Sequence, residues 1–378
     1  MNDKPRIGFY HIWFSLGSFK LKCIKTIDYV FGSMLVFLLP PQQAVPIDRK
    51  AIKRVLIIRP GGLGDAIFLM PYIRILHEKN VRVDVLCEQR NAGVFTGQAG
   101  LLNKIYLSNE LTDIWTILGQ KYNVIIDTEQ WHYLSGILGY FIKADQRVGF
   151  KSRDLREKLY TDSVPYDVNA YELINFGRLF SKVMGDIGMF VELEGSLNVS
   201  KEAADWAAEQ LSGQSVAFFI GASVQARRLT IEQSVAIVAA IIIRGFQVVL
   251  LRGVDVCADA ARIEKQLSNA CLINMVGKAS LMQSAAFIRI SKFFIGSDSG
   301  LMHLACALNK DVLAIFGPGQ MNKWAPTKER HRIFTIHAPC APCTAFGYTV
   351  PTCKGSFFGM KDISVNDIIA AIEDKLNG

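Results

Sequence analysis

The sequence predicts an α/β protein of two Rossmann-like domains, with parallel sheets covered by helices on both faces. Three observations lead to this prediction: a length of 378 residues, short apolar runs that alternate with helical patterns, and one tight turn in each half. A chain of this length commonly forms two domains, and strand–helix alternation is typical of parallel sheets. Because half of the residues are hydrophobic and a fifth are charged, disordered and fibrous chains are excluded.

The first 50 residues are predicted to form an amphipathic segment and a linker. Residues 29–39 are apolar and uncharged, but this run is too short to cross a bilayer as a helix. On a helix, one apolar face is formed by Cys23, Ile27, Val30, Phe31, Met34, Leu35 and Leu38, and Lys20, Lys22 and Lys25 lie near its start. The pattern predicts either a helix in a membrane interface or a helix packed on the body of the protein. A cleaved signal peptide is disfavoured because no clear small-residue cleavage site follows.

The two domains are predicted for residues 51–195 and 196–355. Strands are expected at 55–58, 81–86, 104–107 and 124–126 in the first, and at 216–220, 247–251, 272–275, 293–295 and 312–316 in the second. Ligands of such sheets bind outside the carboxyl ends of the strands. The chemistry is therefore expected in a cleft between the domains.

A glycine turn, Arg59-Pro-Gly-Gly-Leu-Gly-Asp65, follows the first strand and precedes a helix expected over 66–79. Gly61, Gly62 and Gly64 carry no Cβ that would keep a substrate from the backbone. The spacing matches neither a dinucleotide fingerprint nor a P-loop. Because a carboxylate here would repel a phosphate, Asp65 is expected to act as a base towards a neutral hydroxyl. The alternative is that Asp65 only caps the helix.

The second half carries a corresponding turn, Gly296-Ser-Asp-Ser-Gly-Leu-Met-His303. Hydroxyls and free N–H groups at a helix start, supplied by Ser299 and Gly300, are typical of a diphosphate site. His303 stands one turn further on, on the side of Ser299. Asp298 is expected to orient His303, to meet an acceptor hydroxyl or to serve as an ordinary cap.

Two adjacent arginines, Arg227 and Arg228, follow Gly221-Ala-Ser223 in the same half of the chain. Adjacent arginines are either solvated surface charges or phosphate ligands. Because these follow the first strand of the half, where loops face the cleft, both roles remain open.

In this order the motifs resemble glycosyltransferase family 9, the ADP-heptose:lipopolysaccharide heptosyltransferases. The resemblance covers residues from about 54 to 370. It rests on the two turns, Pro71, Asp127, Arg147-Val-Gly-Phe150, Gly221-Ala-Ser223 with Arg227-Arg228, Gly277-Lys-Ala-Ser-Leu281, Phe316-Gly-Pro318 and Trp324-Ala-Pro326. Two departures, Leu229-Thr230 where Trp-Pro is frequent and Arg252-Gly253 in place of a glycine pair, leave the donor sugar open.

The resemblance implies a GT-B fold, with a C-terminal helix (356–378) that returns to the first domain. It also implies transfer with inversion at the anomeric carbon, no required cofactor or divalent metal, and Asp65 as the general base. Arg228, with Arg227 as its alternative, would contact the diphosphate, and the turn of Asp298, Ser299, Gly300 and His303 would hold it through backbone amides.

The cysteines Cys340, Cys343 and Cys353 have the only metal-like spacing in the chain. Structural zinc normally takes four ligands, and a fourth is missing nearby unless His337 or a distant group supplies it. The sequence therefore favours a reduced, metal-free loop, with a structural metal as the alternative and a disulfide disfavoured.

The resemblance therefore implies an enzyme that moves a heptose or related sugar from a nucleotide-sugar, ADP-heptose in that family, to a lipopolysaccharide core or other surface glycan. The net charge of +8 and the apolar N-terminal segment fit an anionic, lipid-linked acceptor at the cytoplasmic face of the inner membrane. Nucleic acid is excluded as a partner because no motif for it is present. The alternatives are an NAD-dependent dehydrogenase that uses Glu88 and an inactive nucleotide-binding subunit of a glycan-assembly complex.

Overall fold

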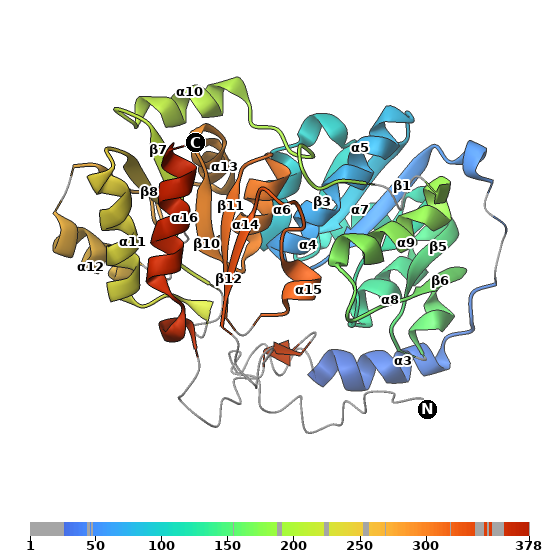
Figure 1. The fold of residues 1–378 in the computed structure, drawn as a ribbon. Helices are drawn as coiled ribbons and strands as arrows, with labels where there is room; N and C mark the ends of the chain where they lie inside the picture. The colour runs from blue at the N-terminus through green and yellow to red at the C-terminus, as the bar shows by residue number, and fades with distance from the viewer. Residues whose placement is uncertain are drawn as a thin grey trace.

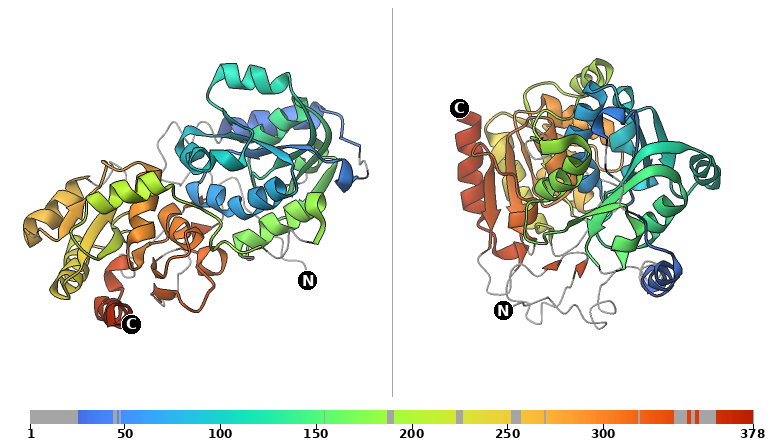
Figure 2. Two further views of the ribbon diagram at one scale, coloured as in Figure 1. Left: turned by 90° about the horizontal axis from the view of Figure 1, so that it is seen from above. Right: turned by 90° about the vertical axis from the view of Figure 1, so that its right-hand side faces the viewer.

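The computed structural model describes residues 26–43, 46, 48–153, 155–186, 191–222, 227–251, 257–268, 270–317, 319–336, 344–345, 348–349 and 359–377. These residues form two six-stranded sheets, each with helices packed against it (Figure 1). The two halves of the chain lie side by side as two lobes (Figure 2). This confirms the predicted α/β class with two Rossmann-like sheets.

The first sheet has the spatial order β3-β2-β1-β4-β5-β6, and every described pairing in it is parallel. Its strands are β1 (Arg54–Arg59), β2 (Arg82–Cys87), β3 (Lys104–Leu107), β4 (Lys121–Asp127), β5 (Lys143–Lys151) and β6 (Asp162–Pro165). The helical segments of this half are η1 (Asp28–Gly32), α3 (Ser33–Leu38), η2 (Arg49–Ala51), α4 (Leu63–Phe68), α5 (Met70–Glu78), α6 (Gln89–Thr96), η3 (Ala99–Leu101), α7 (Leu111–Leu118), α8 (Leu134–Phe141), η4 (Arg156–Leu159) and α9 (Glu172–Met184).

The second sheet repeats this order as β12-β11-β10-β7-β8-β9 and is also parallel wherever pairing is described. Its strands are β7 (Ser215–Phe219), β8 (Gln247–Leu251), β9 (Leu272–Asn274), β10 (Phe294–Ser297), β11 (Val312–Phe316) and β12 (Arg332–Thr335). The helices are α10 (Lys201–Glu209), α11 (Ile231–Ile243), α12 (Cys257–Leu267), α13 (Leu281–Ile290), α14 (Gly300–Ala307), α15 (Met321–Trp324), η8 (Met360–Asp362) and α16 (Val365–Asn377). A short hairpin pairs β13 (Thr344–Ala345) with β14 (Tyr348–Thr349).

Both sheets are buried on both faces, as the apolar runs of their central strands predict. In β7, Val216 and Phe218 belong to one apolar cluster while Ala217 and Phe219 belong to another. The cluster of Ala217 and Phe219 also contains residues of α4, α5 and α14, so it joins the two halves. The order of each sheet reverses between β1 and β4 and between β7 and β10, which places a ligand-binding switch point at the carboxyl ends of these strands.

The nine expected strands are all present, whereas β5, β6 and β12 were not predicted. The nine residues of β5 include Lys143, Asp145, Arg147 and Lys151, and its burial is irregular, so it lacks an apolar run. The edge strands β6 and β12 also lack an apolar run, since β6 contains Asp162, Ser163 and Pro165 and β12 begins with Arg332 and ends with Thr335. The first sheet ends at Pro165 and the second begins at Ser215, on either side of the predicted domain boundary at residues 195 and 196.

The helix predicted over 66–79 is interrupted, since α4 ends at Phe68 and α5 begins at Met70. The break is explained by Pro71, which lies in the first turn of α5. Proline lacks an N–H and is tolerated at a helix start but not in its interior.

The C-terminal helix does not return to the first domain, and that prediction is wrong for α16. Ile368, Ile372 and Leu376 lie in the apolar cluster of the second sheet, where α16 packs beside α11 and β12 (Figure 1). Lys292 Nζ also donates to the carbonyl of Leu376 (2.7 Å). The apolar stripe at three- and four-residue spacing faces the nearest unfilled core, which belongs to the second domain.

The N-terminal helix, formed by η1 and α3, packs on α8 of the first domain. Asp28 accepts hydrogen bonds from the backbone N–H groups of Tyr133 (3.1 Å) and Leu134 (2.8 Å), and its carboxylate lies 3.2 Å from His132 Nδ1. It thereby caps α8 from a distant part of the chain, because α8 has no cap from its own side chains. Burial raises the pKa of Asp28, but the bonds from His132 and the two N–H groups outweigh it and leave the pKa below its ordinary value.

The opposite face of this helix is apolar and exposed. Val36 is fully buried against Tyr133 and Ile137, while Phe31, Met34 and Phe37 are each more than 60% exposed. The other exposed apolar side chains of the helix and the adjoining α8 are Ile27, Val30, Leu35, Leu38, Leu134 and Phe141. One face of the N-terminal helix thus packs on the body of the protein, which is one of the two predicted alternatives. The contact of the exposed face with a membrane stays a prediction. Across the described residues no helix combines the length and apolarity needed to span a bilayer.

We expect Asp28→Ala to loosen the N-terminal helix without unfolding the first domain. Loss of a helix cap costs on the order of 1 kcal/mol, which corresponds to roughly five-fold faster exchange of amides protected by local opening. Hydrogen–deuterium exchange of residues 30–38 measures this effect. Asp145→Ala, which removes an exposed carboxylate paired with Lys121, serves as the control and leaves these amides unchanged; equal exchange in the two variants would contradict the capping role.

Candidate active site

The two predicted turns meet at the junction between the sheets. Helices α4 and α14 begin at the switch points of the first and second sheet, and they pack against each other. A Cβ on Gly64 would lie 2.8 Å from Cδ2 of His303, and a Cβ on Gly300 would lie 2.6 Å from Cδ2 of Leu63. Glycine at both positions is therefore what allows the two helix starts to approach this closely.

The backbone of the first turn also requires glycine. Gly61 has a φ of +107°, a conformation that side chains disfavour. Gly62 is the N-cap of α4, and a Cβ there would lie 2.9 Å from Oδ2 of Asp65. The turn thus folds back on the carboxylate that follows it and fixes Asp65 in the first turn of α4.

Asp65 is partly buried and lies beside the buried Arg59. Its Oδ2 is 3.3 Å from Nη2 of Arg59, and, among the described atoms, its Oδ1 is buried without a hydrogen-bond partner. Burial raises the pKa of Asp65 to about 6, even though the Arg59 guanidinium acts in the opposite direction. A carboxyl with this pKa is ionised near neutral pH and can still accept a proton, as a general base must. Asp65 does not cap the helix with its side chain.

Arg59 connects Asp65 to further charged groups. Its Nη2 lies 3.4 Å from Glu129, and its Nη1 donates to Oε1 of Gln130 (3.3 Å). Gln130 in turn donates to Oε1 of Glu172 (2.8 Å), the first residue of α9. Lys323 of the second half lies 2.6 Å from the other oxygen of Glu172. The network crosses the junction between the two halves.

The second turn brings Asp298 and Arg227 together. Asp298 follows β10, and its Oδ2 lies 2.8 Å from Nη1 of Arg227. Burial raises the pKa of Asp298 in spite of this neighbour. Ser299 is the N-cap residue of α14, and its Oγ is buried with no hydrogen-bond partner among the described residues. An unpaired buried hydroxyl beside the N–H groups of a helix start is an arrangement that suits an anionic ligand.

His303 is a neutral, buried ring. Burial lowers the pKa of His303 to about 3, so the imidazole carries no charge near neutral pH. It packs against Phe68 of α4, with 4.6 Å between ring centroids, and lies 6.0 Å from Trp324. His303 is therefore not oriented by Asp298, which pairs with Arg227, and it can offer a hydrogen bond but not a positive charge.

The remaining predicted residues divide between described and undescribed parts of the chain. Arg228 donates from Nε to the carbonyl of Ala222 (3.1 Å), and its Nη1 lies 3.9 Å from Asp259. Ser223 and the cluster of Cys340, Cys343 and Cys353 lie outside the described residues, as do Cys23 and the lysines at 20, 22 and 25. Within the described part, no group of three or more His, Cys, Asp or Glu side chains is placed to bind a metal.

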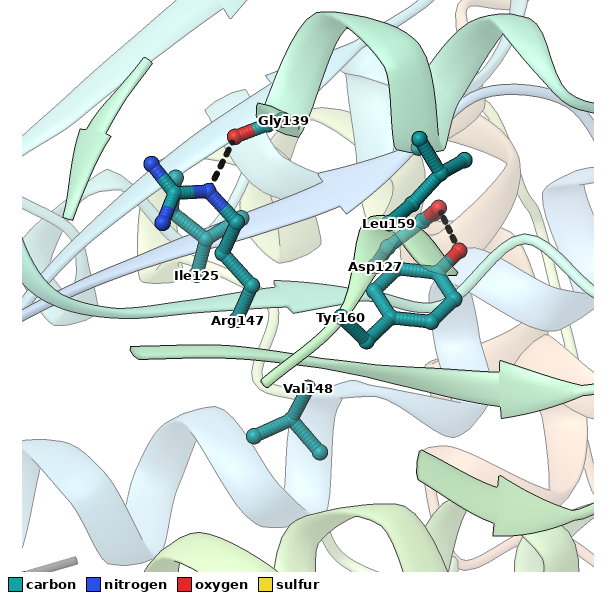
Figure 3. A pocket seen from close by; sticks show the side chains of 8 residues that line it. Ile125, Asp127, Gly139, Arg147, Val148, Leu159 and Tyr160 are labelled. Carbon is teal, nitrogen blue, oxygen red and sulfur yellow. Dashed lines mark hydrogen bonds between the residues drawn. The ribbon is translucent and has the colours of Figure 1, made fainter. Parts of the chain in front are cut away.

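Asp127 and Arg147 take part in separate structural networks. Oδ2 of Asp127 accepts hydrogen bonds from Tyr160 (2.6 Å) and Ser135 (3.0 Å) and lies 3.1 Å from Arg156, while Arg147 donates to the carbonyl of Gly139 (2.9 Å; Figure 3). The two side chains line a crevice that has no room for a water molecule. Ligand sites measure roughly 300–1,000 Å³, so this crevice does not hold a sugar nucleotide.

Three charged residues of the site, Glu129, Glu172 and Lys323, were not predicted. Glu129 comes two residues after Asp127, and Lys323 directly precedes the Trp324-Ala-Pro326 motif, so each had a local signal. Glu172 had none, because its role depends on the packing of α9 across the sheet. Glu88, the residue of the dehydrogenase alternative, pairs with Arg90 (2.6 Å) at the start of α6.

Comparison with known proteins identifies related chains. The family described as Glycosyltransferase family 9 (heptosyltransferase) matches residues 112–351. Lipopolysaccharide heptosyltransferase 2 of Escherichia coli (strain K12) is 33% identical over 63 residues, which are 17% of this chain and 18% of that relative. Lipopolysaccharide heptosyltransferase 3 of the same strain is 23% identical over 282 residues, or 71% of this chain and 78% of the relative. The alignment thus spans less than a fifth of the first relative and most of the second.

A solved structure described as E. coli ADP-heptose lps heptosyltransferase II is similar in fold. It superposes with a TM-score of 0.70 at 19% identity, over 86% of this chain and 98% of that one. The expected GT-B arrangement of two Rossmann-like sheets is confirmed by this likeness.

We expect Gly64→Ala to disturb the junction. The new methyl group would meet the buried His303 ring, and overpacking of this kind costs typically 1–3 kcal/mol. Thermal unfolding of the two variants Gly64→Ala and Gly100→Ala measures the effect, since Gly100 has nothing within 4 Å of its Cβ position. The control keeps the wild-type melting temperature, and an equally stable Gly64→Ala would show that α4 and α14 are not in tight contact.

Proposed function

The chain belongs to glycosyltransferase family 9, and from this membership and the geometry of the junction we propose that it transfers a heptose or related sugar. The donor is ADP-heptose, by analogy with the relative of that description. The acceptor is a lipopolysaccharide core or another surface glycan, by analogy with the lipopolysaccharide heptosyltransferases. One observation carries the proposal: the largely buried carboxylate of Asp65 lies at the junction where the turn of Ser299 and Gly300 also begins its helix.

The proposed reaction is a single displacement with inversion. Asp65 takes the proton of an acceptor hydroxyl, and the oxygen attacks the anomeric carbon of the donor. The bond from that carbon to the diphosphate oxygen breaks, and ADP leaves with the electron pair. The high pKa of Asp65 supports the first step, since burial makes the carboxylate a stronger base than an exposed aspartate.

The departing diphosphate is held by the second domain without a metal in this proposal. The N–H groups at the start of α14 and the unpaired hydroxyl of Ser299 form an anion-binding helix start. Arg227 lies at the same turn through its contact with Asp298, and Arg228 follows it directly. These groups can stabilise the charge that develops on ADP, and neutral His303 adds a hydrogen-bond donor.

We further propose that the enzyme works at the cytoplasmic face of the inner membrane. The exposed apolar face of η1 and α3, extended by Leu134 and Phe141 of α8, forms a surface that would sit in the lipid interface. The net charge of +8 supports attraction to anionic lipid. A lipid-linked acceptor would then reach the first domain from the membrane.

The assignment of Asp65 predicts a specific pH dependence. With a pKa of about 6, kcat/KM for heptose transfer falls about tenfold per pH unit below that value, because a protonated carboxyl cannot accept the hydroxyl proton. Asp65→Asn lowers kcat by a factor on the order of 10² to 10⁴ and leaves ADP binding unchanged in calorimetry. Transfer at the wild-type rate by this variant would remove Asp65 as the base, and a wild-type enzyme without any transfer activity would favour the inactive-subunit alternative.

The membrane proposal predicts weaker vesicle binding after two substitutions. Replacing Phe31 and Phe37 by Ser removes two exposed aromatic rings, and burial of one such ring contributes about 1.5–3 kcal/mol, so binding to anionic vesicles weakens at least about tenfold. Cosedimentation measures vesicle binding, and Ile243→Ser, which replaces an even more exposed apolar residue at the end of α11, is the control. Unchanged binding would contradict the proposal, as would loss of a dimer in ultracentrifugation without loss of vesicle binding.

A further inference from the structure

A buried ion pair joins the two halves of the molecule next to the proposed base. Lys323 lies on α15 of the second half, and its Nζ is 2.6 Å from Oε2 of Glu172 in the first half. Both side chains are at most 1% exposed. Removing two charges from water is costly, and a well-packed apolar pair would often be at least as stable. Stability alone therefore does not explain why this ion pair is present.

The pair ends a chain of polar contacts that begins at Asp65. From Asp65 the chain passes through Arg59 (3.3 Å) and then Gln130 (3.3 Å) to Glu172 (2.8 Å). Tyr166 donates to the Oε2 atom of Glu172 that faces Lys323 (2.8 Å), and the Lys323 ammonium lies 4.5 Å from the centroid of the Tyr166 ring. Glu172 is thus held by several partners while Lys323 approaches it from the other half.

Carboxylates outnumber cations around Asp65, and Lys323 reduces this excess of negative charge. Three carboxylates, Asp65, Glu129 and Glu172, face the two cations Arg59 and Lys323. With Lys323 neutralised, one cation would remain for three carboxylates, and ionisation of Asp65 would be less favourable. The groups that face Asp65 from the surrounding elements are Arg59 on β1, Glu129 after β4, Tyr166 and Glu172 before and on α9, Lys323 on α15 and the neutral His303 on α14.

We propose that Lys323 is a positioning residue for the transfer reaction, supplied by the second domain to keep Asp65 ionised while Glu172 holds the ammonium in place. The inference rests on the proposed function, since it assigns a partner to the proposed base. It implies that the ionised form of Asp65, which alone can accept the hydroxyl proton, is fully populated near neutral pH only when Lys323 of the second domain contacts the first.

Two substitutions in the same ion pair distinguish this role from a structural one. Lys323→Met removes a cation and moves the acid limb of the pH profile of kcat/KM to higher pH. Glu172→Gln removes an anion and moves this acid limb to lower pH. Each shift is on the order of one pH unit. A purely structural latch would weaken the junction in both variants and lower activity in both, without moving the limb in opposite directions.

Further variants protect the test against misfolding. Lys323→Arg keeps the cation and the wild-type limb, and the double variant Lys323→Met with Glu172→Gln removes both buried charges and returns the limb towards the wild-type position. Lys121→Met, which breaks the exposed pair with Asp145, is the matched control and leaves the limb in place.

The outcomes separate the inference from the proposed function. If the wild type transfers heptose and Asp65→Asn does not, but the two single variants shift the limb in the same direction or not at all, the role of Lys323 is overturned while the proposed function stands. If the wild type shows no transfer, the proposed function fails first and the inference fails with it.

Discussion

The contact between the starts of α4 and α14 is the constraint on which the junction depends. A Cβ on Gly64 would clash with His303, and a Cβ on Gly300 would clash with Leu63. The backbone of each helix start therefore contacts a side chain of the other helix directly. Each helix begins at the switch point of its own sheet, where parallel α/β sheets bind ligands. Two sites that would otherwise be separate are thereby brought together, and the residues that follow β1 and β10 face one another.

This close approach also buries charge. Asp65, Arg59, Glu129, Glu172 and Lys323 all lie in or beside the junction, and moving them out of water costs free energy that their mutual pairing only partly offsets. Burial alone would raise the pKa of Asp65 further than Arg59 permits. The same desolvation that is unfavourable for stability therefore gives the carboxylate the basicity that its proposed role as proton acceptor requires.

The sequence predicted the elements whose signal is local. Apolar runs located nine strands because central parallel strands are buried on both faces, and the two turns located Asp65 and Ser299 because helix starts after strands have a recognisable composition. Charged β5 and the short outer strands had no such signal. The position of α16 depends on which hydrophobic core its apolar face fills, and the sequence does not specify that core. The Lys323–Glu172 pair joins residues about 150 positions apart, so it results from tertiary packing and not from a local spacing of residues.

The N-terminal helix and the proposed base are connected through one loop. Oε1 of Glu129 accepts the backbone N–H groups of Trp131 (3.0 Å) and His132 (3.3 Å), while its other oxygen faces Arg59. At the end of this loop, Asp28 holds the N–H groups of Tyr133 and Leu134. The segment that follows β4 is thus fixed from one side by the helix with the exposed apolar face and from the other by the charges around Asp65. Because Glu129 is held at both of its oxygens, a displacement of the N-terminal helix would reach the Arg59–Asp65 pair through few intervening bonds, which links the surface proposed to meet the membrane to the site proposed to perform the transfer.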